Sequence, residues 1–440
     1  MTPFGWPMWI VLVFLFAYGA VLGSFLNVCI YRLPQKDELW PSLVGLWSPP
    51  SYCPKCGRKI WRRDNIPILS WFLLRGRCRF CRRKISFRYP AIELFNALLF
   101  VLVYWLEVPG GFYAHMNQSC TYSLLGPTAV AGSWNFSPVA ILNWRYAYHM
   151  VLFEALIVAT FIDFDLRIIP DGVTVPGMLF GLLGGWILGS VWLVPVWFQS
   201  PELLESLRPL LPKWLQAFTY GPAVPVWIKH HPHWHGLAVS LAGLIVGGGL
   251  VWTVRLIGEL VLKQEAMGFG DVTLMAMIGS FLGWQPTVIV FFLAPLCALL
   301  VVAVSLPFSR DREIPYGPYL SLAALVTVLS FKWLWPRVQN FFALGVLLFV
   351  AAALMLFMLF VSLEFIQLVK RLLGIPLYWE EEWWDEQEQQ QQNEARSLEW
   401  LKQGSRHPAT TPEGDWRRGS DWPGQQAADG SLFSNRWRQW

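Results

Sequence analysis

Charged side chains are scarce in this sequence. Only 14% of its 440 residues are Asp, Glu, Lys or Arg and 55% are hydrophobic, whereas roughly a quarter of a soluble globular chain is charged. The apolar residues gather into runs about 20 residues long, the length that crosses about 30 Å of hydrocarbon as a helix. The 27 tryptophans agree, because indole rings favour the membrane interface. The sequence therefore predicts an all-α polytopic membrane protein and excludes a soluble globular chain.

Basic residues are missing from the N-terminus, where a secretory signal peptide would carry them. No small-residue cleavage site is evident either, so the first apolar run, 7–31, is interpreted as a membrane span. Lys and Arg are also absent from residues 108–143. That segment is rich in Gly, Ser, Asn and Pro, which is typical of a loop on the exterior side.

Basic residues concentrate instead in residues 32–88, which carry fourteen Lys and Arg against three Asp and Glu. Nucleic-acid binding is one interpretation of such a loop. A basic loop beside a bilayer more simply marks the cytoplasmic side and contacts anionic lipid, so we expect no nucleic-acid partner. With this loop inside, the N-terminus lies outside.

The alternation of apolar and polar segments predicts eight or nine spans. The count depends on one short piece, 272–284, which suits a tilted or partly buried helix. By this alternation, both Asp163 and Asp271 face the cytoplasm. The expected spans are 7–31, 91–107, 144–162, a fourth that follows Asp171 and ends near 197, 236–261, 272–284, 287–306, 321–335 and 341–368.

The same pass along the chain predicts five parts. They are 1–107 with the first spans and a cytoplasmic cysteine-containing loop, 108–143 as an exterior loop, 144–320 as a membrane domain, 321–374 as additional spans and 375–440 as a tail. The tail is rich in Gln and Glu and has too little apolar surface to fold by itself. We expect a disordered or partner-bound cytoplasmic appendage whose partner is unknown.

Four cysteines form the most specific soluble motif, Cys53-x-x-Cys56 followed after 21 residues by Cys78-x-x-Cys81. Two such turns place four thiolates around a tetrahedral zinc ion, and four thiolates leave no open position, so the site would be structural. The alternative is two disulfides or four unrelated thiols. A reducing cytoplasm disfavours the disulfides. The other cysteines, Cys29, Cys120 and Cys297, are interpreted as single residues.

Three aspartates lie at the predicted membrane edge. Asp163 and Asp165 close one span and Asp271 opens another, and a carboxylate beside hydrocarbon is expensive enough to indicate function. Two neighbouring carboxyls do not both ionise easily, so one activates water as a base while the other, protonated, polarises a carbonyl.

Two glycines precede the last of these aspartates in Gly268-Phe269-Gly270-Asp271. Glycine lets the backbone approach a substrate strand closely, so Gly268 and Gly270 are predicted to support the site. The alternative for each aspartate is a helix-terminal residue that caps the helix and faces water. That alternative stays open for Asp165 and Asp171 above all.

Five sets of residues follow one another over roughly residues 20–320. They are Gly23-Ser24-Phe25-Leu26-Asn27-Val28 with Tyr31-Arg32-Leu33-Pro34, the two cysteine pairs with Tyr89-Pro90-Ala91-Ile92-Glu93, Ile162-Asp163-Phe164-Asp165 with Ile169-Pro170-Asp171, Gly268-Phe269-Gly270-Asp271, and Ile314-Pro315-Tyr316-Gly317-Pro318. In type and order these sets resemble the bacterial type IV prepilin peptidases, which are membrane aspartyl proteases with a GxGD motif.

The resemblance implies an enzyme with two activities. Such enzymes cut a basic leader from prepilins or pseudopilins at the cytoplasmic face of the bacterial inner membrane, then methylate the new N-terminus with S-adenosylmethionine. Asp163 and Asp271 would be the catalytic pair, in a peptidase domain over 144–320. A register error of two residues would exchange Asp165 with Asp163.

For the methyltransferase half, which the resemblance places in 1–107, no glycine-rich dinucleotide fingerprint is present. The family's matching motifs contain Asn27, Arg32 and Glu93. Glu93 is predicted to orient or deprotonate the incoming amine, and Asn27 and Arg32 to hold the donor or the loop. The alternatives are helix packing for Asn27 and charge anchoring for Arg32.

Some features depart from the family. Thr273 stands where lysine is usual, and the exterior loops, last span and tail look like additions. An exterior group of histidines is interpreted as scattered interfacial residues rather than a metal site; it comprises His230, His231, His233 and His235. Two alternatives to the main interpretation remain: a peptidase that has lost methylation, and a transporter or assembly scaffold whose aspartates carry protons.

Overall fold

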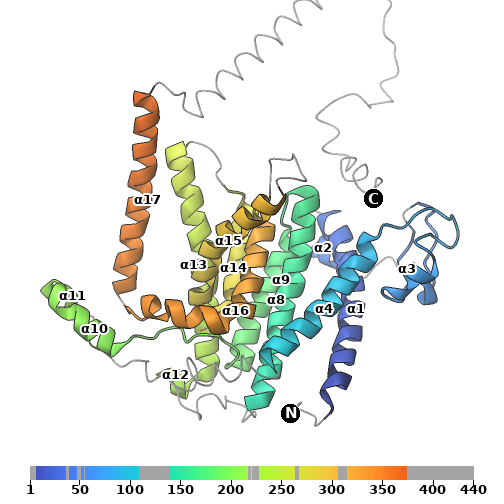
Figure 1. Ribbon diagram of the computed structural model, residues 1–440, viewed down its shortest axis with the longest axis horizontal. Coiled ribbons are helices and arrows are strands. Elements are labelled where there is room, and N and C mark those ends of the chain that lie inside the picture. The colour runs from blue at the N-terminus through green and yellow to red at the C-terminus, as the bar shows by residue number, and fades with distance from the viewer. Residues whose placement is uncertain are drawn as a thin grey trace, which may run out of the picture. The chain divides into compact units, whose positions relative to one another are not determined.

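The computed structural model describes most of the chain as helices (Figure 1). No strand occurs in the described part, only three isolated β-bridges. The described residues are 6–35, 39–46, 51–53, 55–108, 138–216, 220, 227–262, 267–305, 315–345 and 347–373. The predicted tail, 375–440, and most of the exterior loop, 109–137, lie outside them.

Eight of the described helices are long and apolar enough to cross a membrane, which confirms the predicted all-α polytopic fold. They are α1 (Met8–Arg32), α4 (Arg88–Glu107), α8 (Pro138–Leu166), α9 (Asp171–Leu188), α13 (Pro232–Leu262), α15 (Trp284–Ser305), α16 (Gly317–Phe342) and α17 (Leu347–Leu372). The shorter helices are α2 (Leu39–Val44), α3 (Leu69–Leu73), α10 (Pro201–Leu207), α11 (Lys213–Gln216), α12 (Trp227–His230) and α14 (Phe269–Leu282).

The chain divides into two compact units. The first contains residues 1–252 and 267–350, and it holds every residue predicted to carry chemistry. The second contains 253–266 and 351–440, of which the structure describes the end of α13 and most of α17. Apolar side chains of α17 are exposed along its length, as expected for a helix that faces lipid.

Close glycine contacts hold α1 against α4. A Cβ added at Gly19 would lie 2.9 Å from the Ala97 Cα, and one added at Gly23 would lie 2.8 Å from the Glu93 Cα. Four-residue spacing of small residues lets two membrane helices approach this closely. The Asn96 amide reinforces the contact by donating a 3.0 Å hydrogen bond to the Gly19 carbonyl.

The short helix α14 lies at the centre of the first unit and packs against α8, α9, α15 and α16 (Figure 1). Val272 and all of its residues from Leu274 to Leu282 are buried, while Thr273 is partly exposed. Its 14 residues span about 21 Å at 1.5 Å per residue, less than the hydrocarbon thickness. The predicted short span is therefore a buried core helix, as its length indicated.

The segment after α9 packs against the end of α14, so α14 does not have to cross the membrane by itself. The predicted fourth span was wrong beyond Leu188, because Gly189 adopts a left-handed conformation (φ 66°) that ends the helix. Residues 191–194 are nevertheless buried. They lead into a segment whose carbonyls accept hydrogen bonds from the residues just after α14: Trp284 donates to Val196 and Gln285 to Pro195, each at 2.7 Å. Irregular backbone is tolerated in a membrane protein where protein surrounds it in this way.

Helix ends differ elsewhere from the expected spans. The helix α8 begins at Pro138 rather than 144 and continues past Ile162 through both aspartates to Leu166. The helix α16 covers 317–342, instead of 321–335, and α17 covers 347–372, instead of 341–368. Charged residues near the C-terminal ends, such as Asp163, Arg337 and Lys370, lowered the hydropathy there and hid the last turns. The expected start of the last span at 341 was wrong because α16 continues to Phe342.

Candidate active site and metal centre

The two aspartates predicted to form a pair come together from separate helices. Asp163 lies in the last turn of α8 and is 6% exposed, while Asp271 is half-buried in the first turn of α14. The two carboxyls are close enough for their charges to interact. Because α8 and α14 both pack on α9 and α16, the helix bundle itself sets their separation.

Residues at the start of α16 complete the surroundings of the pair. The Gly317 N–H donates a hydrogen bond to the Asp163 carboxyl, and a Cβ added at Gly317 would lie 2.5 Å from the Asp163 Oδ2. The N-terminus of a helix presents free N–H groups and the positive end of its dipole, so it suits a carboxylate. The Tyr316 phenol lies near enough to Asp271 to interact with its charge.

Sequence reasoning missed Tyr316 and Gly317 as site residues. Their segment served only as a landmark of the family, and no role followed from it. The available signal was Gly317 followed by Pro318, a proline near the first helical position that predicts a helix start. Which buried group that start would face depends on tertiary packing.

The two glycines of the GxGD motif differ in their surroundings. A Cβ added at Gly270 would lie 3.0 Å from the Ile169 Cβ, so this glycine packs the start of α14 against the turn between α8 and α9. At Gly268 the nearest atom to an added Cβ is the Asp271 Oδ2, at 3.9 Å. Among the described residues, a Cβ added at Gly268 meets only the Asp271 carboxyl within 4 Å, so Gly268 has more room beside the acid pair than Gly270.

Asp165 and Thr273 both have partners. The Asp165 carboxylate pairs with Arg88 of α4, with 2.9 Å from Nη1 to Oδ1 and 2.7 Å from Nη2 to Oδ2. Thr273, in the place of the expected lysine, donates a 3.0 Å hydrogen bond from its hydroxyl to the Gly270 carbonyl. Asp171, the first residue of α9, is exposed.

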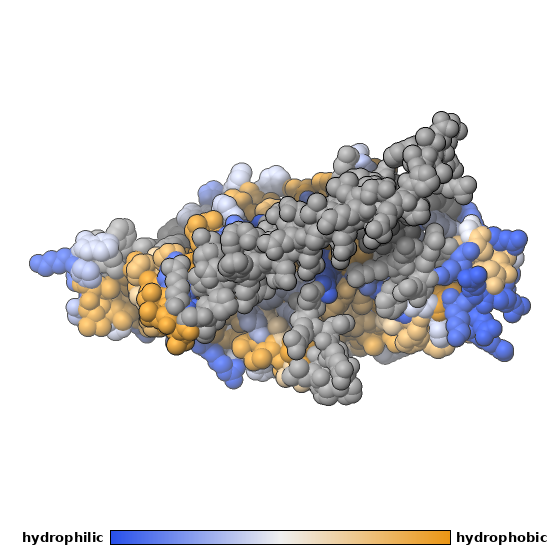
Figure 2. All heavy atoms as spheres, turned by 90° about the horizontal axis from the view of Figure 1, so that it is seen from above, coloured by the Kyte–Doolittle hydropathy of each residue, from blue (hydrophilic) through white to orange (hydrophobic). Residues whose placement is uncertain are grey.

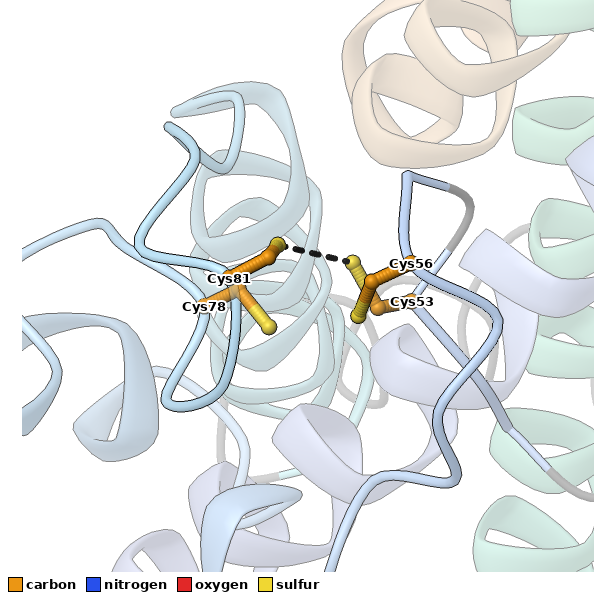
Figure 3. Close-up of side chains that lie close together, drawn as sticks. All are labelled: Cys53, Cys56, Cys78 and Cys81. Atoms are coloured by element: carbon orange, nitrogen blue, oxygen red, sulfur yellow. Dashed lines mark hydrogen bonds between the residues drawn. The ribbon is translucent and has the colours of Figure 1, made fainter.

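The four cysteines converge from two facing turns of the loop over residues 51–87, named here the cysteine loop (Figure 3). Their sulfur atoms all lie within 4.8 Å of one another. The two turns match in backbone. Cys53 N–H donates to Arg58 and Cys78 N–H to Arg83, each at 2.9 Å, and the residues four after each first cysteine are both left-handed.

This geometry fits a tetrahedral metal ion. Zinc–sulfur bonds of about 2.3 Å place the sulfurs of a tetrahedral site about 3.8 Å apart, and the Cys53 and Cys81 Sγ atoms lie 3.9 Å apart. A disulfide needs about 2.05 Å, and the cysteines in the described part of the chain are free thiols. In that same part, these four side chains form the single cluster suited to a metal.

The three polar residues predicted for the methyltransferase half have structural partners. Asn27 donates to the carbonyls of Gly23 and Tyr89, at 3.3 and 3.2 Å. Arg32 donates to two carbonyls just after α2, each at 3.2 Å. The Glu93 Oε2 accepts the backbone N–H of Ile68, at 2.6 Å. The Asn27 contacts fit the alternative of helix packing, whereas the Arg32 contacts fit its predicted role of holding the loop.

Two of the four histidines predicted to be exterior make polar contacts within the protein. The Nε2 of buried His235 accepts the Val196 N–H at 3.0 Å, and the His233 Nδ1 lies 2.7 Å from the Trp186 carbonyl oxygen. Because His235 is 1% exposed, it packs inside the protein rather than at an interface as predicted.

Together these features define a polytopic α-helical membrane protein that combines a buried carboxyl pair with a four-cysteine loop. Comparison with known proteins gives the family. The profile described as "Bacterial Peptidase A24 N-terminal domain" matches residues 17–106, and that described as "Type IV leader peptidase family" matches 210–303.

Curated relatives match over most of their length. The Prepilin leader peptidase/N-methyltransferase of Aeromonas hydrophila is 30% identical over 346 residues, which cover 73% of this chain and 91% of the relative. The Type 4 prepilin-like proteins leader peptide-processing enzyme of Escherichia coli O78:H11 is 31% identical over 321 residues, covering 70% and 90%. The Prepilin leader peptidase/N-methyltransferase of Neisseria gonorrhoeae is 27% identical over 360 residues, covering 77% and 95%. No solved structure matches the chain.

The chain belongs to the type IV leader peptidase family. This confirms the resemblance drawn from the five sets of residues.

Proposed function

We propose that this protein cleaves the basic leader of type IV prepilins or pseudopilins and N-methylates the residue that cleavage exposes. The relatives' names support both activities. The observation that carries the peptidase assignment is the meeting of Asp163 with Asp271 beside the Gly317 N–H. A transporter or scaffold has no need of this arrangement, so that alternative is not favoured.

The carboxyl pair works as a unit in the proposed cleavage. One carboxylate takes a proton from a water molecule, whose oxygen bonds to the scissile carbonyl carbon, while the other, protonated, donates a hydrogen bond to the carbonyl oxygen. The C–N bond then breaks, the pair returns a proton to the leaving amine, and a carboxyl product remains. The room beside Gly268 is the proposed entry for the substrate backbone.

We place the acid pair and the cysteine loop on the cytoplasmic side of the bacterial inner membrane, with the N-terminus outside. Contacts support a common side for both, because the Arg88–Asp165 pair joins the start of α4 to the end of α8. The start of α9 also meets the end of α1, since a Cβ added at Gly172 would lie 3.1 Å from the Leu33 side chain. The basic loop gives the direction, because cytoplasmic loops are enriched in Lys and Arg.

Two cofactors follow from the proposal. Zinc is the metal that best suits four thiolates, and here it would hold together a loop too small to fold around its own core. S-adenosylmethionine would supply the methyl group. Because the side chains of Asn27, Arg32 and Glu93 are engaged by the protein itself, we derive no methyl-transfer step from them, and the amine-orienting role of Glu93 stays a prediction.

A cleavage assay tests the proposal. Purified full-length protein in lipid is mixed with a prepilin and S-adenosylmethionine, and mass spectrometry follows the leader, the mature N-terminus and its methylated form. We expect both cleavage and methylation in the wild type. If folded, zinc-loaded protein leaves prepilins and pseudopilins uncut, the peptidase assignment is wrong. If it cuts without methylating, the methyltransferase half of the proposal is wrong.

A further inference from the structure

The short helix α3 in the cysteine loop presents its apolar side outward. Leu69, Phe72 and Leu73 occupy one face of the helix at i, i+3 and i+4 spacing, and they are between 58% and 76% exposed. Ile66, just before the helix, is 44% exposed. These four residues are named here the apolar stripe. Contiguous exposed apolar side chains of this kind mark an interaction surface.

The opposite side of α3 is fixed to the protein. Ser70 is buried, and its hydroxyl accepts the Ile66 N–H at 2.7 Å. The Trp71 indole donates a 3.1 Å hydrogen bond to the Ile85 carbonyl, and its ring meets Phe87 edge to face at 5.4 Å. Because these inward residues hold the helix, the outward direction of the stripe is built into the fold.

A contact with α4 sets the depth of the stripe. The N–H of Ile68, the residue before α3, donates to Glu93, which lies five residues into the candidate span that begins at Arg88. At 1.5 Å per residue this is about 8 Å along α4. Apolar faces of interfacial helices lie about 5–10 Å into the boundary between headgroups and acyl chains. Figure 1 shows α3 beside α1 and α4.

The hydrogen bond from Ile68 to Glu93 holds an unusual backbone conformation, because Ile68 has a φ of 61°. A β-branched residue avoids this region, so the surroundings must hold it there. The Glu93 carboxyl oxygen that accepts its N–H is the group placed to do so.

Basic residues surround the stripe. Arg75 and Arg77 follow α3 directly and are exposed, as are Arg79, Arg82, Arg83 and Lys84 further along the loop. Figure 2 shows hydrophilic and hydrophobic residues side by side at the end of the molecule that carries this loop. Apolar side chains flanked by Lys and Arg at the level of the headgroups complement an anionic membrane surface.

We propose that the apolar stripe inserts into the cytoplasmic leaflet, with Arg75 and Arg77 on lipid phosphates, so that the cysteine loop is itself a membrane-binding element. The inference rests on the depth of Glu93 along α4 and on the basic residues around α3. It does not rest on either enzymatic activity. A second copy of this chain and a prepilin segment are the other occupants that the test must separate from lipid.

Fluorescence quenching tests the proposal on the full-length, zinc-loaded protein in nanodiscs of phosphatidylcholine and phosphatidylglycerol. An environment-sensitive fluorescent amino acid replaces Leu73 in one sample and Lys59, an exposed residue of the first cysteine turn, in the control. Brominated acyl chains are expected to quench the probe at position 73 several-fold more than the probe at 59. Iodide in the water is expected to quench the probe at 59 more than the probe at 73. Equal iodide quenching at both positions would overturn the proposal.

Two further measurements identify the occupant. Leu69→Ser with Phe72→Ser is expected to lower quenching of the position 73 probe by brominated lipid without loss of zinc, since both side chains are exposed. Discs without phosphatidylglycerol are expected to lower it partly. If protection from iodide appears only with added prepilin, or only as protein concentration rises, the stripe binds substrate or a second copy and the proposal is wrong.

Discussion

The Arg88 Nη2 lies 2.7 Å from the Asp165 Oδ2, joining the first turn of α4 to the last turn of α8. The Arg88 guanidinium also lies over the Phe161 ring, 5.0 Å from its centroid. This pair connects the helices of the cysteine-loop half to the helix that carries Asp163. It also separates the roles of two aspartates only two residues apart, because Asp165 forms an ion pair with Arg88 while Asp163 lies close enough to Asp271 for their charges to interact.

Asp163→Asn and Asp271→Asn are each expected to lower kcat/KM for leader cleavage by about 10³-fold, because removing a general acid or base costs about 10²–10⁴. Neither substitution changes side-chain size appreciably, so protein yield and zinc content should match the wild type. Asp171→Asn is the matched control, since that carboxylate is exposed at the start of α9. Full activity in either variant of the pair would remove that residue from the catalytic site.

Asp165→Asn is expected to affect cleavage indirectly, through the position of the helix end that carries Asp163. It leaves the two reacting carboxyls in place but withdraws the charge that Arg88 pairs with, so cleavage should fall by about tenfold or less, with a lower Tm. The loss of Tm in the double variant Arg88→Gln/Asp165→Asn should be smaller than the sum of the losses in the two single variants, because removing one partner alone leaves a half-buried charge unpaired. Additive effects in this double-mutant cycle would contradict the coupling between Arg88 and Asp165. A 10³-fold loss of cleavage in Asp165→Asn alone would move the catalytic assignment from Asp163 to Asp165.

Much of the fold was visible in the sequence for a physical reason. Crossing hydrocarbon requires about 20 apolar residues, so the spans stand out as runs, and the basic loop predicts their orientation. What hydropathy does not distinguish is a helix from an irregular segment buried in protein. Residues 189–197 continue the apolar run of α9, but Gly189 ends the helix, so the predicted fourth span was too long.

The candidate site was partly predictable for a similar reason. Asp163 and Asp271 stand out because carboxylates at a membrane edge are costly. The partners of other residues depend on packing between segments that are far apart in sequence. Arg88 is 77 residues from Asp165, and Ile68 is 25 residues from Glu93. No local pattern links such pairs, and the Gly317 contact with Asp163 was missed for the same reason.

Gly317→Ala is expected to lower kcat/KM for cleavage at least tenfold, because an added Cβ would lie 2.5 Å from the Asp163 Oδ2 and displace the carboxyl. A displacement of about 1 Å can cost on the order of 10²-fold. Gly249→Ala on α13 is the matched control, since a Cβ added there meets nothing within 4 Å. Steady-state kinetics on both variants, with Tm measured alongside, distinguishes misplacement from unfolding. Equal activity in the two variants would show that the contact relaxes without effect.

Cys78→Ser is expected to abolish tight zinc binding, because three thiolates and a hydroxyl hold the ion far less well than four thiolates. Metal analysis of purified protein should show about one zinc per chain in the wild type and close to none in the variant. Cys297→Ser, in α15 and away from the cluster, is the control and should retain zinc. A Cys78→Ser protein that keeps a full zinc content would contradict the four-thiolate site.

The Asp64–Arg79 pair should make the cysteine loop sensitive to acid. Arg79 Nε and Nη2 donate to the two Asp64 carboxylate oxygens at 2.7 and 2.6 Å, and this hydrogen bonding lowers the pKa of Asp64. A carboxyl whose pKa is lower in the folded state contributes stability above its unfolded pKa of about 3.9, and that contribution disappears as pH falls through the lower folded value.

Asp64→Asn removes this contribution at every pH. The wild type is therefore expected to have a higher Tm than the variant at pH 5 to 7, and the difference should shrink as pH falls below about 4. Comparing the two proteins cancels the protonation of the zinc thiolates, which both share. Glu205→Gln, at an exposed carboxylate of α10 outside the loop, controls for the loss of one negative charge. A Tm difference that stays constant down to strongly acidic pH would mean that the pair contributes packing rather than charge.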